Sequence, residues 1–587
     1  MDIFSVFTLL GGLAFFLFGM NVMSSSLERI AGGRLETALK KMTSNPFKSL
    51  ALGAGITIAI QSSSAMTVML VGLVNSGIMA FSQTIGVIMG ADIGTTFTGW
   101  LLSLTGIESD VWYIKIFKPE NFSPLFAFVG IVLVMMSKKN KRKDLGTILI
   151  GFAVLMYGMV LMKDSVTPLA ETEDFQNLLI AFTNPLLSLL VGAVFTGIIQ
   201  SSAASVGILM SLASATGTIS YKMAIPIIMG LNIGTCVTAI ISSIGVTKDA
   251  KRVSVAHISI KIIGATVWLV LFCVITAIFD IPALDTPIST LGIATIHTIF
   301  NVATILLLLP FSNLIVKLAE KIIPDSSEEE ENTFIDERLL SSPPLAVSQC
   351  QDKTFEMAEI AKKGLIDSLD LIFNYNEKKA AKVVQREQEL DVLEDKLGTF
   401  MILLSQKELT HSDSNTIAKL LHTISDFERI GDHSTNIMEI AQAVSENEDD
   451  FSNAAKVDLK TLFAALSEIL NLTAKTFETN DVKLAETVEP LEEVIDKLTS
   501  KIKDRHISRL QSGKCKPELG ILLSDLLINC ERVSDHCSNV AVCVIQIANS
   551  TLDNHDYLNE LRAERTPEFL ENYKIYKQKY RLADING

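Results

Sequence analysis

Two short polar sequences interrupt apolar stretches in the N-terminal half of the chain. The first is Gln61-Ser62-Ser63-Ser64 and the second is Gln200-Ser201-Ser202. Hydroxyl and amide groups both donate and accept hydrogen bonds without carrying charge. A helix broken at such a sequence inside a bilayer exposes N–H groups that suit an oxyanion and carbonyls that suit a hard cation such as Na⁺. These residues are therefore the first candidates for a binding site.

A second pair of sequences follows, with the pattern Gly-x-Asp/Asn-Ile-Gly-Thr. Its glycines allow close backbone approach, and its polar members are candidate ion ligands: Asp92, Thr95, Asn232 and Thr235. Asp92 is the only carboxylate in its apolar span, where a charge is costly, so we expect it to couple a cation. A buried structural hydrogen bond is the alternative for Asp92, and helix packing is the alternative for any single Ser, Thr or Gly.

These sequences belong to an internal repeat with an offset of 139 to 140 residues. Asn45-Pro46 recurs as Asn184-Pro185, and Phe18-Gly19-Met20 recurs as Tyr157-Gly158-Met159. The repeats cover about 3–137 and 145–279, and a final span at 290–318 follows. Repeats with broken helices are typical of secondary transporters that bind their substrate near the bilayer midplane.

The distribution of charged loops predicts a topology, because Lys and Arg concentrate in short cytoplasmic loops. Basic loops at 24–49, 137–144 and 246–252 are predicted inside, and the stretches 105–121, 163–182 and 280–289 outside. The predicted sides of successive loops are consistent only if 50–77 and 183–216 are hairpins that enter and leave the membrane on the same side. Their arms of about 15 residues are too short to span the bilayer. This topology makes the repeats inverted and places the N-terminus outside. The full spans are then predicted at 3–23, 84–104, 122–137, 145–162, 224–245, 254–279 and 290–318.

Charge composition divides the chain into two unlike parts. Residues 1–324 contain 20 Lys+Arg and 16 Asp+Glu, so 36 of 324 residues are charged. The other 263 residues contain 50−20 = 30 basic and 65−16 = 49 acidic residues, a net charge of −19. A strongly acidic domain argues against nucleic-acid binding. The seven cysteines form no Cys-x-x-Cys pair and no secreted framework, so we expect this part to be cytosolic and reduced.

We predict a transmembrane domain at 1–321, a linker at 322–345, helical bundles at 346–555 and a C-terminal tail at 556–587.

The acidic part also contains a repeat. Four Glu-x-x-x-Asp pairs occur in the bundles, where like charges four residues apart on a helix repel unless a cation offsets them. The predicted metal ligands are Glu387, Asp391, Glu428, Asp432, Glu492, Asp496, Glu531 and Asp535, with His433 and His536 as softer ligands. A solvated charged face is the alternative.

On its paired Gln-Ser-Ser sequences, the segment 3–318 resembles the type II sodium-dependent phosphate cotransporter family. The resemblance implies inorganic phosphate as substrate, Na⁺ as coupling ion and both hairpin tips as the binding region. Ala65, where the family commonly has Thr or Ser, and Ala203, in place of a third Ser, depart from its pattern and bear on ion stoichiometry.

The acidic bundles, over roughly 350–550, resemble the PhoU family of phosphate-signalling regulators. This resemblance implies two three-helix bundles whose Glu-x-x-x-Asp motifs hold a metal cluster, either divalent ions or iron. Both resemblances point to phosphate.

The sequence therefore predicts an all-α, multi-pass protein of the inner membrane, in which a Na⁺-coupled phosphate transporter is joined to a cytosolic regulatory domain. No Walker-type loop, nucleophile triad or closed Cys/His ligand set is present, so no enzymatic activity is expected. Inorganic phosphate, Na⁺ and the lipid bilayer are the expected partners, and assembly into a homo-oligomer stays open. The alternatives are a phosphate exporter on the same fold and a membrane-tethered phosphate sensor.

Overall fold

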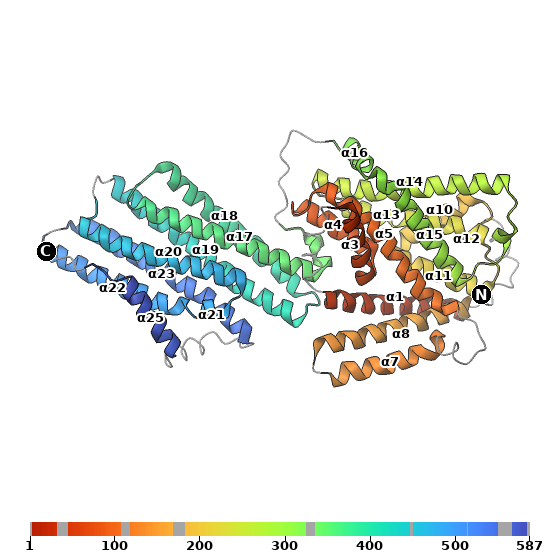
Figure 1. Ribbon diagram of the computed structural model, residues 1–587, viewed down its shortest axis with the longest axis horizontal. Coiled ribbons are helices and arrows are strands. Elements are labelled where there is room, and N and C mark those ends of the chain that lie inside the picture. The colour runs from red at the N-terminus through yellow and green to blue at the C-terminus, as the bar shows by residue number, and fades with distance from the viewer. Residues whose placement is uncertain are drawn as a thin grey trace. The chain divides into compact units, whose positions relative to one another are not determined.

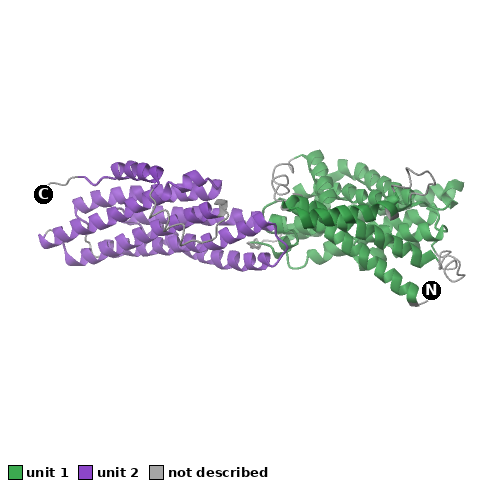
Figure 2. Ribbon diagram, turned by 90° about the horizontal axis from the view of Figure 1, so that it is seen from below, with its two compact units in different colours: residues 1–345 green, residues 346–587 purple. Residues whose placement is uncertain are grey.

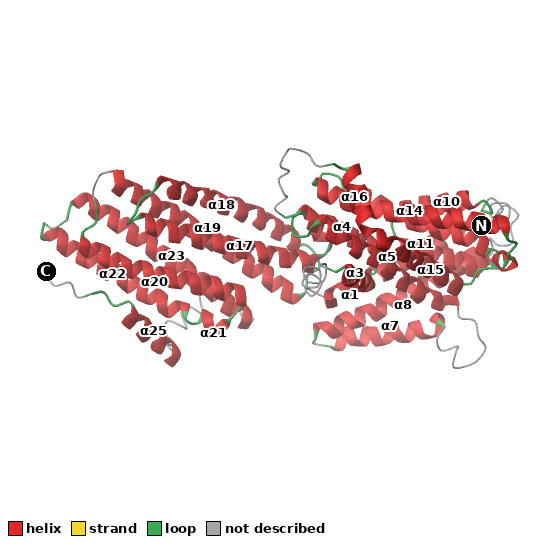
Figure 3. Ribbon diagram, turned by 45° about the horizontal axis from the view of Figure 1, so that its top comes forward, coloured by secondary structure: helices red, strands yellow, loops and turns green. Residues whose placement is uncertain are grey.

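The computed structural model is helical throughout its described part (Figures 1 and 3). It describes residues 3–31, 45–106, 118–137, 139–167, 182–324, 335–446, 450–513, 515–549 and 566–583. Over these ranges one isolated β-bridge pairs Ser220 with Pro287, and no strand is formed. The predicted all-α class is confirmed. Several predicted loop segments lie outside the described residues, namely 32–44, 107–117, 138 and 168–181.

The chain divides into two compact units, residues 1–345 and residues 346–587 (Figure 2). The helices of the first unit follow the apolar stretches of the sequence. They are α1 (Ile3–Ala31), α3 (Pro46–Ile60), α4 (Ser63–Asn75), α5 (Phe81–Ser103), α7 (Pro119–Met136), α8 (Asn140–Val166), α10 (Pro185–Ile199), α11 (Ser202–Thr216), α12 (Tyr221–Gly234), α13 (Cys236–Ser242), α14 (Lys248–Ile278), α15 (Thr290–Leu308) and α16 (Ser312–Ile322).

Among the described residues of this unit, six helical segments are long and apolar enough to cross a membrane. They coincide with six of the seven predicted full spans, while α7, at the predicted span 122–137, is a shorter apolar helix. Both Gln-Ser-Ser sequences separate two short apolar helices, α3 from α4 and α10 from α11. The helices therefore break where the polar sequences predict a break. Re-entry into a bilayer stays a prediction.

The glycines of the second motif allow two helix pairs to touch backbone to backbone. A Cβ on Gly90 of α5 would lie 2.0 Å from the carbonyl oxygen of Leu50 in α3, and one on Gly230 of α12 would lie 2.0 Å from that of Leu189 in α10. The two contacts are separated by 139 and 140 residues in the sequence, so the repeat is also a repeat of packing. Only glycine permits such an approach.

A third glycine contact joins the two repeats directly. A Cβ on Gly12 of α1 would lie 2.9 Å from the carbonyl oxygen of Gly158 in α8, and one on Gly151 would lie 2.8 Å from that of Gly19. Residue numbers rise along one helix as they fall along the other, so α1 and α8 are antiparallel. The contact is reciprocal, as between elements related by a two-fold axis.

The second half of the predicted linker, 322–345, is ordered against the first unit. Leu339, in the 3₁₀ turn Glu337–Ser341, is fully buried and packs on Gly72 of α4. Asp336 is also buried and accepts hydrogen bonds from the Asn75 side chain and, at 2.8 Å, from the backbone N–H of Arg338. This segment is therefore packed on the helix that begins at the first Gln-Ser-Ser sequence, an arrangement that its polar composition concealed.

The second unit contains two sets of three long helices. The first set is α17 (Pro343–Leu371), α18 (Glu377–Ser405) and α19 (His411–Glu446), and the second is α20 (Asn453–Thr479), α22 (Val488–Gln511) and α23 (Pro517–Asn549), with α21 (Val482–Ala485) between α20 and α22. The predicted C-terminal tail, 556–587, contains a further helix, α25 (Pro567–Lys579), that packs on α22.

The glycine contacts make a stability prediction. Gly90→Ala should lower the melting temperature of the detergent-solubilised protein, because overpacking at a helix crossing costs about 1–3 kcal/mol. Gly55→Ala is the matched control, since Gly55 lies on α3 and a Cβ added there would have no atom within 4 Å. The control should leave stability unchanged or raise it through helix propensity. Equal melting temperatures for both variants would contradict the close-packing role of Gly90.

Candidate functional site

Each Gln-Ser-Ser sequence ends one helix and begins the next within two residues. Gln61 and Gln200 both adopt the left-handed conformation, with φ of 57°, and their backbone N–H groups donate to Thr57 and Thr196. Asn45 and Asn184 cap the preceding helices, each followed by a proline at the first helical position. Local sequence therefore specifies where each helix starts and stops.

The serines that follow begin the second helix of each pair. The Ser62 hydroxyl accepts a hydrogen bond from the Ala65 N–H at 3.1 Å, and the Ser201 hydroxyl accepts one from Ala204 at 3.2 Å. Ser62 and Ser201 are thus N-caps, and Ser63 and Ser202 are the first helical residues. At each break the N-terminal end of one helix, with its partial positive charge, adjoins the carbonyl end of another.

The two breaks differ in the surroundings of their glutamines. Gln61 is buried, and its side-chain oxygen accepts a hydrogen bond from the Thr98 hydroxyl of α5 at 2.8 Å. Gln200 is exposed, and Thr238, at the position matching Thr98, instead donates to the carbonyl of Thr235 at 2.7 Å. The same sequence pattern therefore has one covered tip and one open tip.

Thr57 and Thr196 are polar residues near the breaks that the sequence analysis missed. Both are buried, and neither hydroxyl has a hydrogen-bond partner among the described residues. They contact Gly94 and Gly234, where an added Cβ would lie 2.8 and 2.5 Å from the respective threonine Cβ atoms. The signal was available in the sequence, because both threonines stand four residues before the glutamine at the repeat offset.

Asp92 and Asn232 are joined by a buried lysine from a third helix. The Lys261 Nζ atom of α14 lies 2.8 Å from Asp92 Oδ1 and donates to Asn232 Oδ1 at 3.0 Å. The Lys261 and Asp92 side chains are only 5% and 3% exposed. Lys261 therefore neutralises Asp92 and links the matching residues of the two repeats. The rule that singled out Asp92, a charge inside an apolar span, applies equally to Lys261.

The polar network continues one turn away on α14. His257 Nδ1 lies 3.1 Å from the Thr67 hydroxyl of α4, so α14 contacts the helix that starts at Ser63. Both ring nitrogens of His297 lack hydrogen-bond partners among the described residues, and Asn301 donates to the His297 carbonyl at 2.8 Å.

The predicted ligands Thr95 and Thr235 are not drawn into this network. The Thr95 hydroxyl donates to the Ala91 carbonyl at 2.9 Å, and the Thr235 hydroxyl donates to the Asn232 carbonyl at 2.7 Å. Both bonds lie within the local helix. Their hydroxyl oxygens keep lone pairs that can accept or coordinate.

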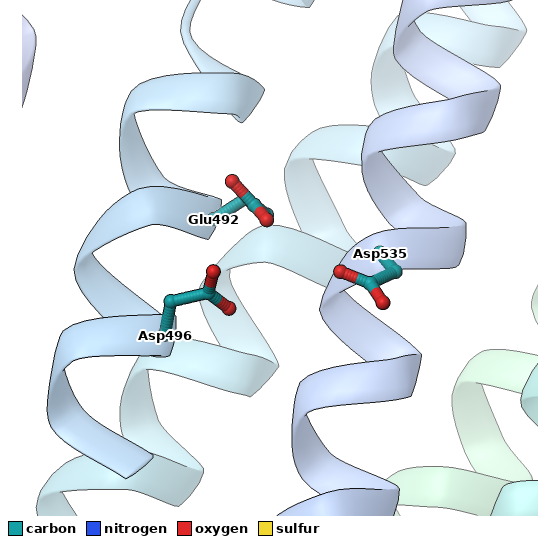
Figure 4. A group of neighbouring side chains, drawn as sticks. All are labelled: Glu492, Asp496 and Asp535. Atoms are coloured by element: carbon teal, nitrogen blue, oxygen red, sulfur yellow. The ribbon is translucent and has the colours of Figure 1, made fainter. Parts of the chain in front are cut away.

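In the second unit, three of the predicted metal ligands converge. Glu492 and Asp496 of α22 and Asp535 of α23 each contribute an oxygen within 4.8 Å of the others (Figure 4). Glu531, the fourth member of this set, is exposed and outside the group. The helical spacing of four residues places Glu492 and Asp496 on one face, toward α23.

The carboxylates of the first helical set also crowd one another. Burial, with the Asp432 carboxylate as the next cause, raises the pKa of Glu428 to about 6. Burial followed by Asp432 and Asp391 also raises the pKa of Glu387. Negative charges held this close disfavour the ionised state, which a bound cation would restore.

The two histidines directly follow the predicted ligands Asp432 and Asp535 in the sequence. His433 Nδ1 is 2.8 Å from Asn529 Oδ1, and His536 Nδ1 is 2.9 Å from Asp426 Oδ1. Their rings are 5.7 Å apart at the contact between α19 and α23. The structure thus places them in a helix contact, and the converging group of three carboxylates contains neither histidine.

Comparison with known proteins assigns each part of the chain to a family. The profile of the Na⁺/Pi-cotransporter family matches residues 15–164 and 154–285, and the profile of the PhoU domain matches residues 354–441 and 459–544.

Three relatives illustrate these matches. YjbB of Salmonella typhimurium, whose name describes an inorganic phosphate export protein, is 23% identical over 94% of this chain and 99% of its own. The uncharacterized protein YqeW of Bacillus subtilis is 30% identical over 53% of this chain and 96% of its own. The rat sodium-dependent phosphate transport protein 2A is 29% identical over 22% of this chain and 20% of its own.

The Lys261 contact generates a prediction with an internal control. Lys261→Met leaves the Asp92 carboxylate buried without its counter-charge, which should cost about 3–5 kcal/mol and lower the melting temperature in detergent. The double variant Asp92→Asn with Lys261→Met should recover most of the loss.

Lys222→Met is the matched control, because Lys222 pairs with Asp285 at 3.8 Å on an exposed surface. A surface pair is worth about 0–1 kcal/mol. A Lys261 variant as stable as the Lys222 variant would show that the buried ion pair is not needed.

Proposed function

Because the N-terminal half of the chain belongs to the Na⁺/Pi-cotransporter family and PhoU domains follow it, we propose that this membrane protein moves inorganic phosphate across the inner membrane, coupled to Na⁺. The observation that carries the proposal is the pair of helix breaks at the Gln-Ser-Ser sequences. Each break supplies helix N-terminal N–H groups for an oxyanion and carbonyl oxygens for a cation.

The residues we assign to phosphate are those at the two helix breaks, namely Gln61, Ser62, Ser63, Ser64, Gln200, Ser201 and Ser202. Ser63 and Ser202 stand at the first helical position, where backbone N–H groups and the helix dipole favour negative charge. Their hydroxyls add donors without adding a competing charge.

For Na⁺ we assign side-chain oxygens, and first of all buried hydroxyls that have no hydrogen-bond partner among the described residues. The buried hydroxyls of Thr57 and Thr196 fit this description, since neither has a hydrogen-bond partner among the described residues. Thr95 and Thr235 add lone pairs nearby in sequence. Lys261 contacts Asp92 Oδ1 at 2.8 Å, so Na⁺ would bind this carboxylate through Oδ2 or after displacement of the Lys261 ammonium.

We further propose that the two repeats are inverted and alternate access to a shared midplane site. The antiparallel, reciprocal contact of α1 with α8 supports this arrangement, because these helices occupy the same place in their repeats. The difference between a buried Gln61 and an exposed Gln200 is what one of two alternating states would display. This topology places the N-terminus outside and the PhoU domains in the cytosol.

Two rival functions share this scaffold. Export of phosphate is favoured by relatives whose name describes an export protein and that align over nearly their whole length. A tethered phosphate sensor would keep the binding residues and lose the flux. The direction of coupled transport follows the ion gradients, so the Na⁺ dependence of the flux and the presence of any flux are the observations that separate these functions.

The prediction uses phosphate flux in proteoliposomes with an imposed Na⁺ gradient. Ser63→Leu and Ser202→Leu should each reduce flux at least about tenfold, because a hydrogen bond to a charged group is worth about 1.5–3 kcal/mol and leucine adds bulk. Thr295→Leu is the control, since the Thr295 hydroxyl bonds back to its own helix at Leu291. Full flux in both serine variants would show that the helix breaks are not part of the phosphate site.

The wild-type protein in the same assay tests the function itself. Flux that follows the Na⁺ gradient supports coupling, and flux indifferent to Na⁺ refutes it. Phosphate efflux that runs down the phosphate gradient and does not respond to Na⁺ favours the exporter. Phosphate binding without flux favours the sensor.

We also propose that the PhoU domains bind a divalent metal or iron and regulate transport. The convergence of Glu492, Asp496 and Asp535 supports this, because carboxylates so close together suit a hard cation. The domains would then control the membrane half, without lining its permeation path.

Metal content tests this regulatory site in the full-length protein. Asp496→Asn with Asp535→Asn should lower the amount of bound metal and abolish the rise in melting temperature on metal addition. In the wild type, metal at a hundredfold excess over Kd should stabilise the fold by about 2.7 kcal/mol. Glu439→Gln with Glu478→Gln is the control, because both are exposed carboxylates of the same unit. If the first variant bound as much metal as the wild type, the carboxylates would be a solvated charged face and not a metal site.

A further inference from the structure

A groove in the described part of the acidic second unit is lined by positive charge. It lies between α22 and α25 with the residues that follow α25, and its volume is about 670 Å³. Six of its twelve described lining residues are Lys or Arg, and none is Asp or Glu: Lys497, Lys501, Arg505, Lys574, Lys577 and Arg581. This concentration of cations lies within residues 325–587, whose net charge is −19, so it needs a physical explanation.

Helical spacing directs these cations into the groove from both sides. Lys497, Lys501 and Arg505 are four residues apart and form one stripe on α22. Lys574 and Lys577 are three residues apart on α25, and Arg581 continues that stripe past its end. Two positive stripes that face one another repel, and an anion between them removes the repulsion.

Part of this charge is already positioned by the protein. Lys497 Nζ contacts Glu493 Oε1 at 2.6 Å and the Tyr573 hydroxyl at 2.7 Å. Arg505 donates to the fully buried Asp458 at 2.8 Å. These contacts hold the walls of the groove in place at low entropic cost to a ligand.

The remaining lysines are uncompensated in the described structure. Lys501 and Lys574 are exposed, and neither has a salt bridge to a described carboxylate. The Lys577 ammonium lies 5.6 Å from the centre of the Tyr573 ring. Lys501 and Lys574 therefore contribute one uncompensated charge from each stripe to the groove.

We propose that this groove binds an oligophosphate, an anion with three or more linked phosphate groups. Lys and Arg are the usual phosphate ligands, and a stripe of eight residues is about 12 Å long, which exceeds a single phosphate. The Tyr573 and Tyr580 rings are buried at 8% and 7% exposure, so neither offers an open face for a stacked base. The recognised part is thus the phosphate chain, whether inorganic or attached to a nucleoside.

The proposal is independent of transport and of the metal site. An oligophosphate here would report the phosphorylated state of the cell to a unit that the chain joins to the membrane half. Failure of the transport assay would leave it standing, and its own failure would leave the proposed transport function standing.

The test is calorimetric titration of the full-length protein in detergent with four probes: sodium tripolyphosphate, ATP, AMP and orthophosphate. Tripolyphosphate should bind at least a hundredfold more tightly than orthophosphate and AMP, and its affinity should fall as salt is added. Equal affinity for ATP and tripolyphosphate would show that the groove recognises the phosphate chain alone. Tighter binding of ATP would assign the nucleotide as the source.

Variants decide whether the binding occurs in this groove. Lys501→Gln with Lys574→Gln should weaken tripolyphosphate at least tenfold, whereas Lys483→Gln with Lys503→Gln, which removes two exposed lysines elsewhere in the unit, should not. Binding should persist in Asp496→Asn with Asp535→Asn, which excludes a bridge through metal. The proposal is overturned if wild type fails to bind tripolyphosphate or if the two lysine double variants lose affinity equally.

Discussion

The membrane half depends on one backbone constraint: a helix must end and another must begin within two residues, among apolar neighbours. The freed backbone groups need partners there, since lipid supplies none. Gln61 and Gln200 meet the constraint in the left-handed conformation. The backbone N–H of each donates to a threonine carbonyl one turn earlier. Glycine would adopt this conformation at less cost, but it would lose the side-chain amide that accepts from Thr98. Gln61 therefore combines a turn with a hydrogen-bonding side chain, which explains why backbone strain is retained at this position.

The second constraint is charge neutrality inside the bilayer. An isolated Asp92 would be costly there, and Lys261 offsets it while also holding Asn232. The ammonium thus occupies a place between the repeats where a transported cation could otherwise act. A protein with such a tethered cation can keep Asp92 neutralised through the transport cycle, and Na⁺ would then rely on uncharged oxygens such as those of Thr57 and Thr196. Coupling to Na⁺ is compatible with Lys261 if these oxygens suffice, if Na⁺ uses Asp92 Oδ2, or if Lys261 moves.

Much of the architecture followed from the sequence because its signals are local. Apolar length predicted the spans, Asn-Pro and Ser marked the helix starts, and the repeat offset related the two halves. Contacts between distant segments were not predictable in the same way. The pairing of Asp92 with Lys261 joins residues 169 positions apart, and neither composition nor periodicity specifies such a partner. Polar composition was also misleading at Leu339, where a single apolar side chain fixes a segment that reads as a linker.

In the second unit, one helix carries two clusters of opposite charge. Glu492 and Asp496 of α22 face α23, while Lys497 and Lys501 face α25. Each cluster is repulsive within itself, so each is stabilised by a ligand of the opposite sign. A cation bound at the carboxylates would leave more positive potential at the lysines, and an oligophosphate bound at the lysines would leave more negative potential at the carboxylates. If both proposed sites bind, their occupancies favour one another, and linkage requires the effect to be equal in both directions. The unit would then respond to metal and oligophosphate jointly, through a single helix.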